Sequence, residues 1–462
     1  MLFSSLTFLY FFLPAVLLCY FIAPARYKNA VLLIFSLLFY AWGEPKYVFL
    51  MAATVALGWA AGLMTEKSRG TKASRLWLLL AVGAVLLLLG IFKYADFFIE
   101  SFSAATGLSV PLLRLALPVG ISFYSFQLIS YLVDVYRATV PAQRSPVKLA
   151  AYICMFPQLI AGPIVRYSDI APKLDERCHS FDMAASGITR FMLGLGKKVI
   201  IANSMGALCS AFQQSSERSV LFFWLYAIAF TLQIYYDFSG YSDMAIGLGR
   251  ILGFKFMENF NYPYISRSIT EFWRRWHISL GSWFRDYLYI PLGGNRVSKP
   301  RWFFNIFVVW FCTGFWHGAD WNFMLWGLYF AVLLVLEKLW LLKLLEKSRI
   351  LSHAYTLLLV IMGFVLFNAA SLPEAISCIS GLFGIGAGGI AGAESLYYLR
   401  SYALLLILAI LGATPLVRQG LERLGSYGSA AVLRPLGCLA LLAVCTAYLV
   451  DGSFNPFLYF RF

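Results

Sequence analysis

The chain carries the stretch Trp310-Phe311-Cys312-Thr313-Gly314-Phe315-Trp316-His317-Gly318-Ala319-Asp320-Trp321, which holds one imidazole between two tryptophans. The segments 302–316 and 321–336 on either side of His317 are apolar enough to lie in a bilayer. A polar group in hydrocarbon needs a partner or a water-filled cavity, so histidine is rare at such a place. The stretch therefore predicts a membrane hairpin whose His317 is either functional or hydrogen-bonded in a helix interface.

The composition of the whole chain agrees with a membrane protein. Of its 462 residues, 61% are hydrophobic and 13% are charged, whereas a soluble domain carries about 25% charged residues. Such a chain fits a polytopic helical protein, in which helices satisfy the backbone polar groups. The net charge of +15 is then best explained by basic cytoplasmic loops that set topology. No nucleic-acid-binding motif is present, so nucleic acid is not an expected partner.

The apolar segments predict an all-α fold with about eleven or twelve transmembrane helices. The expected spans are 2–22, 31–42, 47–64, 76–92, 115–133, 188–212, 220–235, 302–316, 321–336, 354–367, 402–416 and 436–450. The first span lacks a basic leader and a clear cleavage site, so it is interpreted as retained. Basic residues gather in alternate loops, which predicts a cytoplasmic face for the loops after the first and third spans.

Three segments interrupt this pattern. The run 155–166 is apolar but broken by two prolines and a glycine, which indicates a re-entrant or half-buried helix. The region 231–250 contains the polar run 235–243, which is either a polar helix end at the interface or the lining of a cavity. The run 269–285 interleaves aromatic and basic residues. It predicts an amphipathic helix at the inner face, capped by Ser268 or Thr270, that offers guanidinium groups to a phosphorylated ligand.

Several kinds of site are not indicated. The eight cysteines form no CxxC pair and the four histidines are scattered, so neither a disulfide framework nor a metal site is expected. The chain has no GxSxG elbow, P-loop or dinucleotide fingerprint. By the predicted topology, His317 lies near the outer ends of its two spans and His277 lies on the inner amphipathic segment. For His277 the structural alternative is an interfacial residue of a basic helix.

An ordered set of motifs resembles the membrane-bound O-acyltransferase superfamily, and in particular its alginate-type branch. The motifs extend over nearly the whole chain, and their order makes the match specific. They are Leu117–Gln127, Phe156-Pro157-Gln158 with Gly162-Pro163, Tyr236–Asp243, Phe272–Leu280, Arg285–Gly294, Phe315-Trp316-His317-Gly318 and Asn455-Pro456-Phe457.

The resemblance implies a fold and two site residues. It implies one integral-membrane domain over 1–462, built as a ring of tilted helices around a thin central region crossed by a tunnel. N-terminal helices then occupy 1–148, a catalytic core with re-entrant and interfacial segments occupies 149–349, and C-terminal helices occupy 350–462. The family's invariant histidine matches His317, and its second, upstream polar position matches His277.

The resemblance also implies the substrates and partners. The donor is acetyl-CoA from the cytoplasm, with no resident cofactor and no metal, and the acceptor is an exported polysaccharide such as alginate, reached through a periplasmic acetyltransferase partner. The protein is then a multi-pass protein of the cell inner membrane, with the lipid bilayer as its other partner. CoA phosphates need cations, and Arg274, Arg275, Arg285 and Lys255 are on the expected side.

The chemistry agrees with this expectation and leaves alternatives open. Neutral imidazole removes a proton from a hydroxyl near pH 7, and His317 acts either as this base or as a transient acyl carrier. The acceptor is alginate or another exported glycan. A non-catalytic polymer-export subunit and an acyltransferase that uses long-chain acyl-CoA are the other classes considered.

Overall fold

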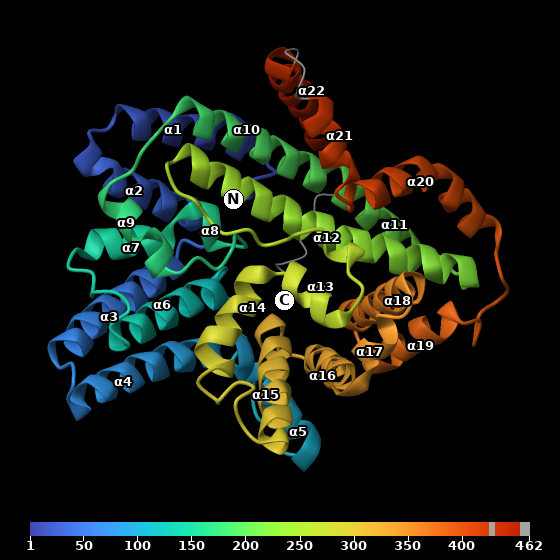
Figure 1. The fold of residues 1–462 in the computed structure, drawn as a ribbon, viewed down its shortest axis with the longest axis horizontal. Coiled ribbons are helices and arrows are strands. Elements are labelled where there is room, and N and C mark those ends of the chain that lie inside the picture. Colours follow the sequence, from blue (N-terminus) through green and yellow to red (C-terminus); the bar gives the residue numbers. More distant parts are fainter. Residues whose placement is uncertain (425–429, 453–462) are drawn as a thin grey trace. The chain divides into compact units, whose positions relative to one another are not determined.

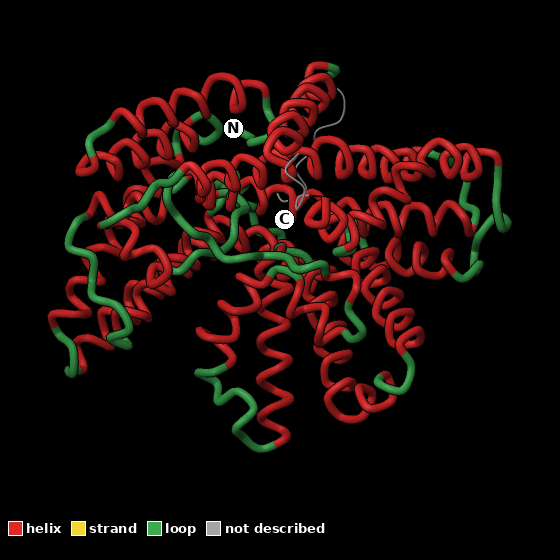
Figure 2. Tube along the Cα trace, turned by 45° about the horizontal axis from the view of Figure 1, so that its top comes forward, coloured by secondary structure: helices red, strands yellow, loops and turns green. Residues whose placement is uncertain are grey.

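The computed structural model describes residues 1–424 and 430–452, which form helices and connecting loops without a strand (Figures 1 and 2). The prediction of an all-α protein is confirmed over these residues. The predicted motif Asn455-Pro456-Phe457 lies outside them.

The helices, in chain order and as labelled in Figure 1, are α1 Leu13–Ile22, α2 Lys28–Ala41, α3 Tyr47–Lys67, α4 Lys72–Leu89, α5 Ala95–Thr106, α6 Ile121–Tyr136, α7 Pro146–Cys154, α8 Phe156–Leu159, α9 Tyr167–Asp175, α10 Phe181–Gly196, α11 Asn203–Gln214, α12 Val220–Ile251, α13 Ile269–Arg275, α14 Ile278–Phe284, α15 Lys299–His317, α16 Trp321–Leu336, α17 Leu342–Leu345, α18 Arg349–Asn368, α19 Leu372–Leu382, α20 Ala393–Gly412, α21 Leu416–Leu424 and α22 Ala430–Val450.

Six of the described helices are long and apolar enough to cross a bilayer, which agrees with a polytopic membrane protein. They are Tyr47–Lys67, Lys72–Thr106, Val220–Ile251, Arg349–Asn368, Ala393–Gly412 and Val432–Val450. The number is smaller than the eleven or twelve expected, because several predicted spans are shorter helices. One of them, predicted to begin at residue 115, begins only at Ile121, after Gly120 with a positive φ of 76°. Glycine adopts that backbone conformation readily, and it ends the irregular segment before α6.

The chain forms two compact units. The first comprises Met1–Phe191 and Met244–Met257, and the second comprises Met192–Asp243 and Glu258–Phe462. In the first unit, α3 packs against α4 and α6. A Cβ at Gly58 of α3 would lie within 2.9 Å of three atoms of the Leu128 side chain of α6, so a small residue permits this close contact. The predicted division at residues 148 and 349 stays a prediction.

The polar run 235–243 lies inside α12, which continues without interruption from Val220 to Ile251. The interpretation of this run as a helix end at the interface is therefore wrong, and the helix expected over 220–235 continues to Ile251. The acids of this run pair with lysines of another segment: Lys198 forms a buried ion pair with Asp237, and Lys197 forms a partly buried one with Asp243, both at 2.7 Å. A buried charge costs less when an oppositely charged partner compensates part of the free energy lost on removing it from water.

The two helices predicted on either side of His317 are confirmed with nearly the predicted bounds, as α15 and α16, although neither is among the six long apolar helices. Two glycines bring the two helices of this hairpin together. A Cβ at Gly314 would lie 2.2 Å from the Phe323 backbone oxygen, and a Cβ at Gly327 would lie 2.2 Å from the Trp310 backbone oxygen. Small residues at both crossing points therefore set the spacing of the two helices.

We expect Gly327→Ala to separate the hairpin and to lower the stability of the protein by about 1–3 kcal/mol, the usual cost of overpacking. The added methyl group would meet backbone, which has no rotamer to move away. Thermal unfolding of the purified protein in detergent measures the effect. Gly83→Ala in α4 is the matched control because a Cβ there meets nothing within 4 Å. Equal unfolding midpoints for the two variants would contradict the prediction.

Candidate active site

His317 is the last residue of α15, and the turn after it is fixed on both sides. A Cβ at Gly318 would lie 2.1 Å from the Phe323 ring, so this position admits no side chain without movement. Asp320 then caps α16 by accepting a hydrogen bond from the Asn322 backbone N–H at 3.0 Å. The imidazole of His317 is consequently held at a defined place, and its residue is only 8% exposed.

Aromatic rings enclose the His317 imidazole. The ring centroids of Trp316, Trp326 and Phe367 lie 5.0, 5.2 and 5.4 Å from that of His317, each nearly perpendicular to it. The His277 ring lies 6.4 Å away. The expectation that the two histidines occupy opposite sides of the membrane is therefore wrong. The reason is that the segment before and after His277 packs into the protein interior, where Phe272, Trp276 and Leu280 are buried.

The predicted amphipathic helix over 269–285 is two short helices, α13 and α14, with His277 between them. The backbone of His277 is left-handed, with a φ of 45°. This conformation is costly for a residue with a side chain and persists only where the surroundings enforce it. Ser268 caps α13 through the Glu271 backbone N–H at 3.0 Å, as one of the two predicted alternatives. Burial, not a surface position, therefore determines the course of this segment.

A buried carboxylate attaches α13 to the end of the hairpin. Glu337, the first residue after α16, accepts hydrogen bonds from the backbone N–H groups of Ile269 and Thr270 at 2.6 and 2.8 Å, and from the Thr270 hydroxyl at 2.7 Å. A negative charge at a helix N-terminus is stabilised by the unpaired N–H groups and the helix dipole. The segment that presents His277 is thus anchored to the hairpin that presents His317.

A short hydrogen-bond chain fixes the orientation of the His277 ring. The Asn259 amide donates to the Ser242 hydroxyl at 3.1 Å, and its oxygen accepts from the Ser279 backbone N–H at 3.2 Å and from the Ser279 hydroxyl at 2.9 Å. The one hydroxyl proton of Ser279 is therefore used. At its long contact of 3.5 Å with His277 Nδ1, the Ser279 oxygen can only accept, so Nδ1 carries the proton and Nε2 carries the lone pair.

Nε2 of His277 and the indole Nε1 of Trp326 lie near His317, are buried and have no hydrogen-bond partner in the described part of the chain. The first is an acceptor and the second is a donor. Buried polar groups are nearly always paired, so atoms of a bound substrate are suitable partners for both. Burial lowers the pKa of His277 to about 3, which keeps this imidazole neutral at physiological pH.

The three arginines expected to bind the donor differ in their availability. Arg275 pairs with Glu271 at 2.9 Å, and Arg285 pairs with the neighbouring Asp286 at 2.6 Å. Arg274 is exposed and pairs with no carboxylate among the residues that the structure describes. Of the three, Arg274 is therefore the guanidinium most available to a phosphate group.

Sequence reasoning did not select four residues that belong to this site. Asn259 and Ser279 orient His277, Trp326 contributes the buried indole N–H, and Glu337 holds α13. Only Ser279 lies within a motif quoted for its chemistry. The sequence offered one further signal, which is the asparagine at 259 among the aromatic residues before α13.

Comparison with known proteins agrees with this geometry. The sequence model of the family described as MBOAT, membrane-bound O-acyltransferase family, matches residues 142–381, which include both histidines, Ser279 beside His277 and the three arginines. The chain belongs to the membrane-bound O-acyltransferase family. It is therefore a membrane O-acyltransferase, and the earlier resemblance is confirmed.

Relatives within the O-acyltransferases differ in the polymer that their names specify. The chain is 41% identical to the probable alginate O-acetylase AlgI of Azotobacter vinelandii, with all of both chains covered. It is 34% identical to the peptidoglycan O-acetyltransferase of Helicobacter pylori over 83% of this chain and 80% of the relative. It is also 30% identical to the teichoic acid D-alanyltransferase of Bacillus subtilis, over 47% of this chain and 58% of the relative.

Proposed function

We propose that this O-acyltransferase takes an acetyl group from cytoplasmic acetyl-CoA and passes it across the cell inner membrane towards an exported polysaccharide, through a periplasmic acetyltransferase partner. Alginate is the first polymer to test, because a relative that matches over its full length is named for alginate O-acetylation. Another exported glycan is the second candidate, since a relative named for peptidoglycan matches over most of the chain.

The observation that carries the proposal is the placement of two neighbouring imidazoles at opposite kinds of helix end. His317 lies at the C-terminal end of α15, where the carbonyl dipoles stabilise positive charge. His277 precedes the first turn of α14, where the N–H dipoles disfavour it. Environments that separate two titratable groups in this way commonly assign them different roles. His317 is suited to gain a proton, and His277 is suited to stay neutral.

The reaction then follows in balanced steps. His317 removes the proton of the acceptor hydroxyl as the oxygen attacks the thioester carbonyl carbon, and an imidazolium forms. The carbon–sulfur bond breaks, the CoA thiolate leaves and takes the proton from His317, and the acceptor keeps the acetyl group as an ester. The Nε2 lone pair of His277 accepts a hydrogen bond from a second hydroxyl group of the acceptor and so orients the reacting one. The indole N–H of Trp326 donates to the oxyanion of the tetrahedral intermediate.

We expect Arg274→Gln to raise the KM for acetyl-CoA about tenfold and to leave kcat nearly unchanged, because a charge-assisted contact to a phosphate is lost from an exposed site. Arg285→Gln should have a smaller effect, since Asp286 already neutralises that guanidinium. Steady-state kinetics of CoA release measure both. Arg349→Gln, an exposed arginine at the start of α18, is the matched control. A tenfold fall in kcat with unchanged KM would contradict a role in donor binding.

The activity itself is tested with the purified full chain in liposomes. Release of CoA thiol from acetyl-CoA in the presence of an acceptor supports the enzyme, and its absence at every acceptor tried would favour the polymer-export subunit. Palmitoyl-CoA as a better donor than acetyl-CoA would overturn the choice of donor. In cells that export alginate, loss of polymer acetylation on deletion and its return on complementation identify the polymer. Unchanged alginate with reduced acetylation of another glycan selects that glycan.

A further inference from the structure

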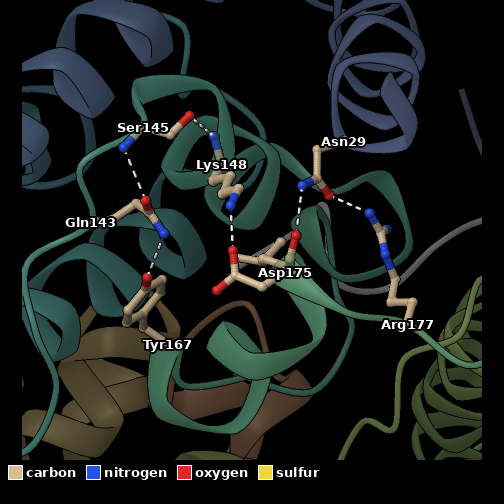
Figure 3. A network of polar contacts seen from close by, with 8 residues as sticks. Asn29, Gln143, Ser145, Lys148, Tyr167, Asp175 and Arg177 are labelled. Atoms are coloured by element: carbon tan, nitrogen blue, oxygen red, sulfur yellow. Dashed lines mark hydrogen bonds and ion pairs between the residues drawn. The ribbon is translucent and has the colours of Figure 1, made fainter. Parts of the chain in front are cut away.

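Arg177 lies in the loop between α9 and α10 of the first unit and is held from several sides. It donates a hydrogen bond to the Asn29 side chain of α2 (Figure 3). Its guanidinium carbon lies 4.8 Å from the Phe254 ring centroid and 5.7 Å from that of Tyr20. Its Nη1 is buried and has no hydrogen-bond partner among the described residues, although such donors are rarely left unpaired. The guanidinium is thus fixed in place, and its Nη1 still has hydrogen-bond donors available for a ligand.

A second cation lies at the same aromatic ring. The Lys28 ammonium is 4.9 Å from the Tyr20 ring centroid and 5.6 Å from that of Phe21. The His179 ring lies 5.6 Å from the Tyr20 ring. Because the Tyr20 hydroxyl donates to the Leu252 backbone oxygen at 2.8 Å, His179 Nε2 is the donor in its 3.0 Å contact with the same hydroxyl. Three basic side chains from distant parts of the sequence therefore meet around Tyr20.

No carboxylate neutralises these basic groups among the residues that the structure describes. The nearest acid in the sequence that forms an ion pair is Asp175, and its carboxylate is directed at Lys148 (Figure 3). Burial lowers the pKa of His179, and the positive charges of Lys28 and Arg177 lower it further. Like charges held close together repel each other. Such an arrangement persists at lower cost when an anion occupies it.

The surroundings of this basic cluster are those of a membrane surface. Ile22, six residues before Lys28, is 73% exposed, and Phe181, two residues after His179, is 95% exposed. The Phe21 ring, about half exposed, lies 5.6 Å from the His179 ring. Exposed apolar side chains beside basic ones are typical of the boundary between hydrocarbon and lipid headgroups. Basic residues at that boundary attract anionic lipid phosphates.

We propose that Lys28 and Arg177, with His179 beside them, bind a phosphate group at the membrane surface. The group belongs to an anionic lipid headgroup or to a soluble phosphate ester, and the exposed apolar residues favour the lipid. None of these residues belongs to the site of the two histidines, so this is a separate binding site. It does not depend on the proposed reaction, and its occupancy is measurable in the absence of acetyl-CoA.

Thermal unfolding of the purified full chain in a neutral detergent tests the site by titration. The probes are dioctanoyl-phosphatidylglycerol, dioctanoyl-phosphatidylcholine and sn-glycerol 3-phosphate. We expect a saturable rise of the unfolding midpoint with phosphatidylglycerol and little or none with phosphatidylcholine. Arg177→Gln and Lys28→Gln should each weaken the apparent affinity about tenfold, because each removes a charge-assisted contact. A response to glycerol phosphate alone assigns the site to a soluble ester; a response to the lipid alone assigns it to a headgroup.

Lys72→Gln is the matched control, since Lys72 is an exposed lysine at the start of α4 in the same unit and should leave the titration unchanged. Lys28→Gln also guards against misfolding, because it leaves the bond between Arg177 and Asn29 intact. Arg177→Lys keeps the charge and should retain most of the affinity. Wild-type affinity in both glutamine variants, or equal responses to the two lipids, would overturn the proposal.

Discussion

The variant His317→Ala should lose acyl transfer while its amount in the membrane stays normal. We expect CoA release from acetyl-CoA to fall by about 10³-fold, within the range of about 10²–10⁴ for loss of a positioned general base. The fall should lie in kcat, because the imidazole acts on the acceptor proton during the reaction and has no part in holding CoA. Steady-state kinetics of the reconstituted protein, with membrane level measured by immunoblot, check the result.

His353→Ala provides the matched control for this variant. His353 is a partly exposed histidine of α18 and is not among the rings that enclose His317, so its replacement should leave both kcat and KM unchanged. His317→Gln tests whether a polar side chain of similar size is sufficient, because glutamine has no basic nitrogen. Near-wild-type turnover by His317→Ala or His317→Gln would exclude His317 as the base and would leave the enclosed imidazole a structural residue.

The variant His277→Asn should lower kcat by about 10²-fold, the lower range for loss of a residue that assists proton transfer. Asparagine is chosen because it tolerates the left-handed backbone at this position, so the fold is kept while the Nε2 lone pair is lost. Burial lowers the pKa of His277 to about 3, so its Nε2 lone pair is present near neutral pH. The acid limb of the kcat/KM profile near neutral pH therefore belongs to another group and should not move in this variant.

Two further variants separate orientation from fold. Ser279→Ala removes the oxygen that accepts from Nδ1 and should lower kcat less than His277→Asn does, with an unchanged KM for acetyl-CoA. Ser279→Thr retains the hydroxyl and should recover much of the loss. His277→Ala, in contrast, places alanine in a strained backbone, so its lower stability is not diagnostic. If the acid limb of the kcat/KM profile shifts in His277→Asn, then His277 titrates near neutral pH, which would contradict the conclusion that burial keeps it neutral.

The hairpin and its histidine could be predicted from the sequence because both depend on local signals. Two apolar runs of suitable length border a short turn with glycine and aspartate, and an imidazole there stands out against its neighbours. The glycines at 314 and 327 matter because of close backbone contact, which sequence spacing alone does not reveal.

The course of the segment around His277 could not be predicted for a physical reason. Interleaved aromatic and basic residues are expected of a helix at the membrane surface, but here tertiary burial of Phe272 and Trp276 determines the fold. The left-handed backbone of His277 is enforced by bonds on both sides of it, since the Asn259 backbone oxygen accepts from Ile278 and the Arg275 backbone oxygen accepts from Asn261. These partners are more than a dozen residues apart in the sequence, and no periodic pattern of residues predicts the bonds between them.

The polar run in α12 is a second case in which contacts distant in the sequence determine the structure. Asp237 and Asp243 suggested a break because isolated acids are costly in an apolar helix. Their partners, Lys198 and Lys197, come from a separate segment and remove that cost. The sequence shows each buried acid but not the lysine that pairs with it. The expected helix was therefore ended at a run of polar residues through which the helix in fact continues.

The bond between Glu337 and α13 has a mechanical consequence. One carboxylate joins the far end of α16 to the first turn of the helix that leads into His277, while the other end of the hairpin presents His317. The two imidazoles are therefore attached to the same pair of helices, so a movement of the hairpin should shift both together. Because Glu337 lies twenty residues after His317 in the sequence, the separation of the two imidazoles depends in part on a contact at the opposite end of the hairpin.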